Sequence, residues 1–123
     1  MNLLVELNAQ FSTEFTEVHA HQLCEIKALN DTDRLTRFLG DVHIVKSAEE
    51  VSSCHKAGVP QSILPLLLVR QPEFVDYYGF EIRDPAYPVV VFAVHTVVHT
   101  WPDLNAFIGW IKAGITADSP PLR

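Results

Sequence analysis

Valine dominates the segment between residues 89 and 98, where it fills six of ten positions. The two branches at the Cβ atom of valine crowd the preceding turn of a helix, so this density favours extended backbone over helix. We therefore predict β structure from residue 89 to residue 101. The segment is either one strand or a hairpin that turns near residues 95 and 96.

Two histidines, His95 and His99, lie four residues apart in this segment. On a helix that spacing would be typical of half a metal site. On a straight strand the two residues are separated by about 13 Å, at a rise of roughly 3.3 Å per residue, which is too far for one ion. A hairpin would not by itself bring the imidazoles together, and no third ligand lies nearby in the sequence. We therefore expect no metal site and no cofactor.

Three more segments have the composition of strands. DVHIVK at 41–46 alternates and is β-branched, whereas ILPLLLV at 63–69 and FVDYYGFEI at 74–82 are apolar runs bounded by turn residues. Pro65 has no N–H to donate, which predicts a bulge or a sheet edge at that point. Short turns join the later strands, so we predict an antiparallel sheet of about four to five strands.

A stripe of apolar residues marks the N-terminal part of the chain. Its members recur at steps of three and four: Leu4, Leu7, Phe11, Phe15 and Val18. This spacing places them on one face of a helix. We predict a long N-terminal helix over residues 3–28, with a break near residues 12–13.

Two shorter helices are predicted from their end signals. DTDRLTRFLG at 31–40 has a polar cap and ends at Gly40, which can adopt a left-handed conformation. In SAEE at 47–50, Ser47 can accept a hydrogen bond from the amide of the third helical residue, while Glu50 reaches back to the start of the helix. That helix is expected to end near Gly58.

A C-terminal helix follows TWPD, with Thr100 as a candidate cap and Asp103 near the positive end of the helix dipole. Its apolar face consists of Leu104, Phe107, Ile108 and Ile111, and Gly114 is expected to end it. The element order predicts an α+β fold: an antiparallel sheet with helices packed mainly on one side, a long N-terminal helix and a C-terminal helix.

The length of 123 residues predicts a single domain over residues 1–123, with a flexible tail at 115–123. The first residues show neither the basic start nor the small-residue cleavage site of a signal peptide, and no apolar run is long enough to span a membrane. There are only two cysteines, Cys24 and Cys54, far apart in the sequence. We therefore expect a cytoplasmic protein with reduced thiols.

The net charge of −6 is unevenly distributed. Four glutamates precede the first basic residue, Lys27, and between residues 73 and 111 there are five acidic residues and a single base, Arg83. Such a surface repels phosphate backbones, which disfavours nucleic acid as a partner. An acidic surface would attract a basic protein partner. The same charge is also explained by solubility, without any partner.

The sequence contains no recognisable catalytic pattern. GxSxG, a glycine-rich phosphate loop and CxxC are all missing. Cys54 lies on the apolar side of its predicted helix, which is typical of a structural cysteine. Asp76 and Glu81 point to opposite faces of their strand, so they do not form an acid–base pair. We expect a protein that is not an enzyme and has no catalytic residues.

Three segments carry a resemblance to a known family: VDYYGFEI, YPVVVFAV and TWPDLNAFIGWI. In this order they resemble the SUKH superfamily, which includes bacterial immunity proteins and yeast cell-wall-synthesis regulators. The resemblance covers about residues 41–112. In the preceding part, LNDTD and FLGD stand where the family has a Leu-Pro signature and an Asn-Gly or Gly-Gly turn.

The resemblance implies an α+β domain that neutralises a toxin, such as a nuclease or deaminase, by covering its basic active-site face. The acidity of the chain agrees with a basic protein partner. Our candidate partner-binding residues are Tyr77 and Glu81, on the strand face opposite Tyr78 and Phe80, and Asp84 and Tyr87, in the proline-containing loop.

Two other functions are compatible with the sequence. One is a structural or regulatory protein-interaction module that acts as a homo-oligomer, such as a homodimer. Several aromatic residues suit either kind of binding protein, since Tyr and Trp are favoured at interface hot spots: Tyr77, Tyr78, Tyr87, Trp101 and Trp110. The other, less favoured, is a small enzyme that uses the histidines. Neither nucleic acid nor a membrane is an expected partner.

Overall fold

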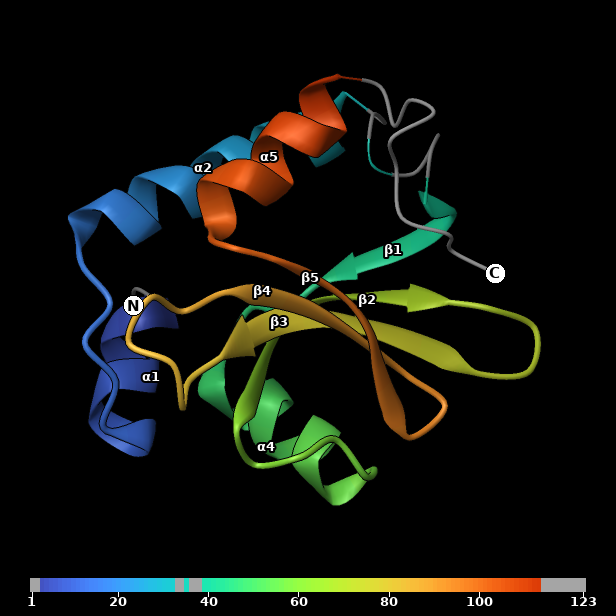
Figure 1. Ribbon diagram of the computed structural model, residues 1–123, viewed down its shortest axis with the longest axis horizontal. Helices are drawn as coiled ribbons and strands as arrows, with labels where there is room; N and C mark the ends of the chain where they lie inside the picture. Colours follow the sequence, from blue (N-terminus) through green and yellow to red (C-terminus); the bar gives the residue numbers. More distant parts are fainter. Residues whose placement is uncertain (1–2, 33–34, 36–38, 114–123) are drawn as a thin grey trace.

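Five strands form one antiparallel sheet in the part of the chain that the computed structural model describes, which is residues 3–32, 35 and 39–113 (Figure 1). The elements, in chain order, are α1 (Leu3–Phe11), α2 (Glu17–Asp31), β1 (Asp41–Ile44), α4 (Ala48–Lys56), β2 (Ile63–Arg70), β3 (Val75–Glu81), β4 (Val89–Ala93), β5 (Thr96–Trp101) and α5 (Leu104–Lys112). The strands are neighbours in the same order, from β1 to β5. The predicted α+β fold, with helices at both ends of the sequence, is confirmed.

The valine-rich segment is the hairpin of β4 and β5. Its two-residue turn consists of Val94 and His95, whose φ angles are +49° and +71°. Two positive φ angles define the turn type that matches the twist of paired strands. Of the two predicted conformations, the hairpin is therefore correct, and it turns one residue earlier than expected.

Pro65 lies at a β-bulge in β2, as predicted. It pairs with Gly79 of β3, and the register shifts between Pro65 and Leu67. Strand β1 pairs with β2 only from Leu67 to Arg70, so on that side Pro65 has no neighbouring strand in the described sheet. The missing N–H of proline therefore costs no ladder hydrogen bond.

The main core lies between the sheet and helices α2 and α5, which are above the sheet in Figure 1. It contains Tyr78 and Phe80 from β3 together with the predicted apolar face of α5, Leu104, Phe107, Ile108 and Ile111, all buried. Helix α4 lies on the other side of the sheet. There Cys54 packs with Val90 and Phe92 in a smaller cluster. Helices α2 and α5 thus cover one face, α4 covers part of the other, and α1 packs against α4.

The N-terminal stripe is divided between α1 and α2, which confirms the predicted break. Phe15 lies in the loop between the two helices, and Val18 is 63% exposed on α2, so these two residues do not continue one helix face. Ser12 has a φ of +58°, and the side chain of Asn8 holds the loop that follows. Its Oδ1 accepts hydrogen bonds from the Thr13 hydroxyl at 2.7 Å and the Phe15 N–H at 2.9 Å, and its Nδ2 donates to the Phe15 carbonyl at 3.0 Å. Helix α2 then continues to Asp31, three residues beyond the predicted end.

The helix caps agree with the sequence in part. The Ser47 hydroxyl accepts from the Glu50 N–H at 3.2 Å, as predicted, but the Glu50 carboxylate accepts from the Lys46 N–H at 3.1 Å instead of the backbone of Ser47. The cap of α5 is Asp103, not Thr100: its carboxylate accepts from the Ala106 N–H at 2.8 Å. Thr100 is unavailable because it belongs to β5, paired with Val90.

Two predicted turn glycines are confirmed by their positive φ angles, +107° at Gly40 and +113° at Gly58. The predicted helix at 31–40 lies partly outside the described residues. Gly114 and the predicted tail at 115–123 lie wholly outside them.

His19 belongs to an aromatic cluster at the start of α2. Its ring centroid lies 5.3 Å from that of Phe15 and 5.9 Å from those of Phe80 and Tyr87. Its Nδ1 accepts the Thr16 N–H at 3.1 Å, which caps the helix. Burial lowers the pKa of His19 below its usual value, since a charged imidazolium is poorly solvated there.

We expect acid to destabilise the protein through His19. Because its pKa is lower in the folded state, the unfolded state binds the proton more readily, so stability falls as the pH drops through and below about 6.5. Protonation at Nδ1 would also break the cap. Urea unfolding at about pH 7.5 and about pH 5.5 measures the loss. His19→Gln, which can keep the cap, should reduce it, whereas His95→Gln at the exposed turn should not. An identical pH dependence in the parent and His19→Gln would contradict this account.

Candidate protein-interaction surface

The four predicted partner-binding residues do not form one patch. Tyr77 faces the α4 side of the sheet and is half-buried against the cluster around Cys54. Tyr87 is also half-buried instead of exposed: its ring lies 4.7 Å from that of Phe15, and its hydroxyl accepts the Glu14 N–H at 2.9 Å. Tyr87 therefore packs against the main core, on the face opposite Tyr77.

The two predicted carboxylates have internal partners. The Glu81 side chain is only 15% exposed, and its two oxygens accept from Nε and Nη2 of Arg83 at 3.0 and 3.1 Å. Asp84 is exposed, and its carboxylate accepts the Ala86 N–H at 2.9 Å within the loop. Arg83 neutralises the charge of Glu81, which leaves Asp84 as the more accessible of the two.

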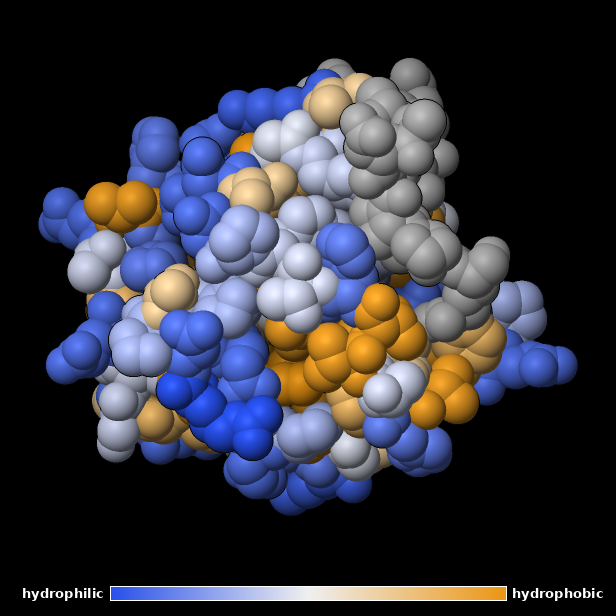
Figure 2. Space-filling view, in the orientation of Figure 1, coloured by the Kyte–Doolittle hydropathy of each residue, from blue (hydrophilic) through white to orange (hydrophobic). Residues whose placement is uncertain are grey.

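The β4–β5 hairpin carries a different kind of surface. From residue 85 to residue 102 the sequence has no Asp, Glu, Lys or Arg, although the chain as a whole is strongly acidic. Within it Val94, Val97 and Val98 are 60%, 44% and 37% exposed. Figure 2 shows an apolar area on the surface over this hairpin. We call strand β5, which includes Val97 and Val98, and Val94 of the adjoining turn the hairpin surface.

Strand β5 is also an edge of the sheet. In the described structure it pairs with β4 on one side only, so its outer backbone N–H and C=O groups are available to another strand. Natural edges are protected by charges, proline or a bulge. Strand β5 has a register shift opposite Val91 and Phe92 but neither a charge nor a proline. The other edge, β1, is four residues long and includes Asp41.

The signal for the hairpin surface was present in the sequence. The absence of charge over residues 85–102 is visible there, but an exposed and a buried valine look alike in a sequence. Exposure depends on which strand forms the edge. The order of the strands in the sheet follows from the pairing of segments that are far apart in the sequence.

His95 and His99 do not converge on a common site. His95 is exposed at the turn, whereas His99 is half-buried, with its ring 4.6 Å from that of Trp101. Within residues 3–32, 35 and 39–113, no three His, Cys, Asp or Glu side chains cluster in a way that would hold a metal ion.

A small cleft on the α4 side brings together His43, Glu50, Cys54 and Tyr77, with a volume of about 290 Å³. His43 Nε2 donates to Glu50 Oε2 at 2.6 Å. Burial would raise the pKa of Glu50, but hydrogen bonds from His43 and the Lys46 N–H outweigh it and lower that pKa. Burial raises the pKa of both Cys54 and Tyr77. The thiol and the phenol are therefore protonated at neutral pH, which is unfavourable for nucleophilic catalysis.

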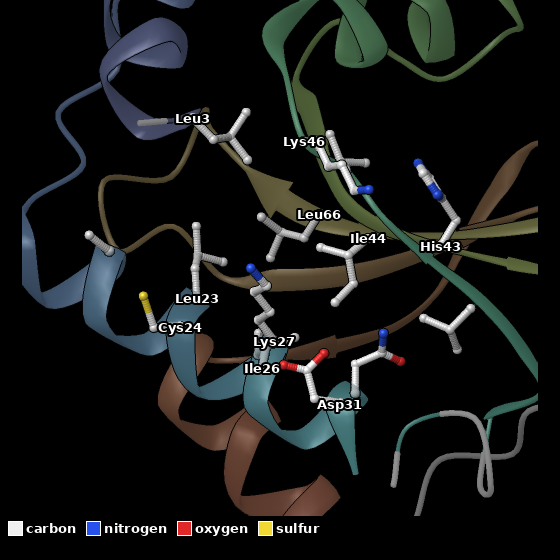
Figure 3. Close-up of a pocket in the computed structure, with 14 residues that line it drawn as sticks. Leu3, Leu23, Cys24, Ile26, Lys27, Asp31, His43, Ile44, Lys46 and Leu66 are labelled. Atoms are coloured by element: carbon white, nitrogen blue, oxygen red, sulfur yellow. The ribbon is translucent and has the colours of Figure 1, made fainter. Parts of the chain in front are cut away.

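A larger cleft lies on the other face of β1, between this strand and helix α2, with a volume of about 650 Å³. Figure 3 shows Leu23 and Ile26 of α2 on one wall, and Ile44 and Leu66 on the other. Its residues come from segments far apart in the sequence, which is why sequence patterns did not indicate it.

No family model, no curated protein and no solved structure matches this chain. The relationship to the SUKH superfamily therefore stays a prediction that rests on three sequence segments. Among the described helices, none has the length and apolar character needed to cross a membrane.

Proposed function

We propose that this chain is a non-enzymatic, cytoplasmic protein-binding domain that binds its partner by strand addition at β5. The observation that carries the proposal is that the edge strand β5 has no charged residue and exposes Val97 and Val98, next to the exposed Val94 of the turn. A partner strand would pair with the outer backbone groups of β5, and its apolar side chains would cover Val97 and Val98. The protonated state of Cys54 and Tyr77 supports a binding role over a catalytic one.

The partner that suits the hairpin surface best is a second copy of the chain. Two molecules with a charge of −6 repel each other at most surfaces, but the hairpin contributes no acidic or basic residue to the contact. Two β5 strands can pair antiparallel about a two-fold axis, so that each presents the same residues to the other. The product is one continuous sheet in which neither β5 strand is an edge and a short β1 strand lies at each end.

Analytical ultracentrifugation over a range of protein concentrations tests this proposal. We expect the parent protein to form a dimer at micromolar concentrations and the double variant Val97→Lys, Val98→Lys to be a monomer. Lysine on an edge strand prevents pairing because its charge would be buried in the joined sheet. Circular dichroism should show that the variant keeps its fold.

The matched control is Val18→Lys on α2. Val18 is 63% exposed, and it lies outside the hairpin surface, so this variant should still form the dimer. A parent protein that stays monomeric throughout, or a double variant that still forms the dimer, would show that β5 is not the interface.

A second candidate is the immunity-type function, in which the domain covers the basic face of a toxin. The observation in its favour is the acidic N-terminal part, where Glu14 and Glu17 are exposed at the start of α2 and no basic residue occurs before Lys27. This function predicts a salt-dependent association rate with a basic protein, whereas self-association through the uncharged hairpin predicts little salt dependence.

A further inference from the structure

The cleft between α2 and β1 has the size and lining of a small-molecule site. Its volume of about 650 Å³ lies within the range usual for ligand pockets. Apolar side chains from both walls line it: Leu3, Leu23, Ile26, Val42, Ile44 and Leu66. A ligand bound here would place an apolar body against these side chains.

Two lysines give the cleft a positive character that is unusual in this chain. The described residues include six basic side chains, and three of them, Arg70, Arg83 and Lys112, form ion pairs with carboxylates. Among the remaining three, Lys27 and Lys46 both line the cleft. In Figure 3, Lys27 extends from α2 toward the wall that holds Leu66 and Ile44, and Lys46 lies on that opposite wall.

The lining also includes the carboxylate of Asp31, one helical turn beyond Lys27, and the imidazole of His43, whose Nε2 is hydrogen-bonded to Glu50. The lining therefore contains two ammonium groups and one carboxylate, in a protein whose total charge is −6. The excess positive charge is complementary to a ligand with one anionic group.

Asn30 adds a third feature. It lines the same cleft, and its Oδ1 is buried without a hydrogen-bond donor among the described residues. Buried acceptors in native proteins nearly always have a donor. A ligand that carries an N–H or O–H group close to its anionic end would supply it.

We propose that this cleft binds a small amphipathic carboxylate, an acyl chain joined to a carboxylate by a group with an N–H or O–H donor. The apolar chain packs against Leu23, Ile26 and Ile44. The carboxylate pairs with Lys27 and Lys46, and the donor bonds to Asn30 Oδ1. The site is separate from strand β5 and does not depend on the proposed self-association.

Isothermal titration calorimetry with N-octanoylglycine tests the proposal, since this probe has an eight-carbon chain, an amide N–H and one carboxylate. We expect saturable binding to the parent protein and at least about tenfold weaker binding to the double variant Lys27→Gln, Lys46→Gln. The control is Lys56→Gln, which removes the third lysine without an ion pair, outside the cleft, and should bind like the parent. Both lysines of the cleft are exposed, so thermal melting should show an intact fold.

Two related probes identify which group is recognised. The neutral amide N-octanoylglycinamide should bind more weakly than the acid, and O-octanoylglycolate, which has no N–H, should lose affinity for the parent but not for Asn30→Ala. No binding of N-octanoylglycine to the parent would overturn the proposal. So would equal binding by the double lysine variant, or equal binding of the acid and its neutral amide, which would indicate adsorption to apolar surface alone.

Discussion

Replacing Phe107 by alanine is expected to lower the free energy of unfolding by about 3–5 kcal/mol, because a large cavity would remain in a closely packed core. Phe107 is fully buried in α5. Its ring centroid lies 4.8 Å from that of Trp101, 5.7 Å from Tyr78 and 6.0 Å from Trp110. This ring therefore joins the last helix to strands β3 and β5.

Urea denaturation followed by circular dichroism measures the effect. The expected result is a large decrease in the denaturation midpoint, and Ile108→Ala on the same buried face should also destabilise, by about 2–5 kcal/mol. Val18→Ala, at an exposed position of α2, is the control and should change stability by less than about 0.5 kcal/mol. A midpoint for Phe107→Ala equal to that of the parent would mean that α5 does not pack on the sheet.

Replacing Gly79 by alanine is expected to destabilise the protein by about 3 kcal/mol, the upper end of the usual range for overpacking. Gly79 is buried in β3, opposite the bulge at Pro65. An added Cβ atom would lie 2.4 Å from the carbonyl oxygen of Leu64 and 2.8 Å from the Cα atom of Pro65. Both are backbone atoms, so no side-chain rotation can relieve the overlap and β2 itself would have to move.

Gly109 in α5 offers a control with the opposite sign. Its position is exposed, and an added Cβ atom would have no neighbour within 4 Å. Gly109→Ala should therefore stabilise the helix by roughly 0.5–1 kcal/mol, because alanine loses less backbone entropy there. Denaturation midpoints for both variants test the pair. A Gly79→Ala variant as stable as the parent would mean that β2 does not approach β3 this closely at the bulge.

Local chemistry in the sequence predicted most of the elements correctly. The break in the N-terminal helix, the Ser47 cap and the bulge at Pro65 each depend on residues that are close together in the sequence. The buried face of α5 follows from helical spacing alone. These features were predictable because rotamer restriction, capping and the missing N–H of proline act on the nearest backbone groups.

Other features depend on contacts between distant segments. Val94 at the hairpin turn has a positive φ, which a valine adopts only where the pairing of β4 with β5 imposes it. Thr100 is not the cap of α5 because β5 extends past it. Tyr87 is half-buried because its ring packs against Phe15 and its hydroxyl accepts the Glu14 N–H, both more than 70 residues earlier in the chain.

The candidate sites also depend on contacts between distant segments. Valine density predicts that β5 is a strand, but its place at the edge of the sheet results from the order in which five strands pair. Lys27 and Lys46 are 19 residues apart, on a helix and just after a strand, and only the packing of α2 over β1 places them in one cleft. Conformational preference is a property of neighbouring residues. Exposure and juxtaposition arise when the whole chain buries its apolar surface, and here they were decided by the tertiary structure.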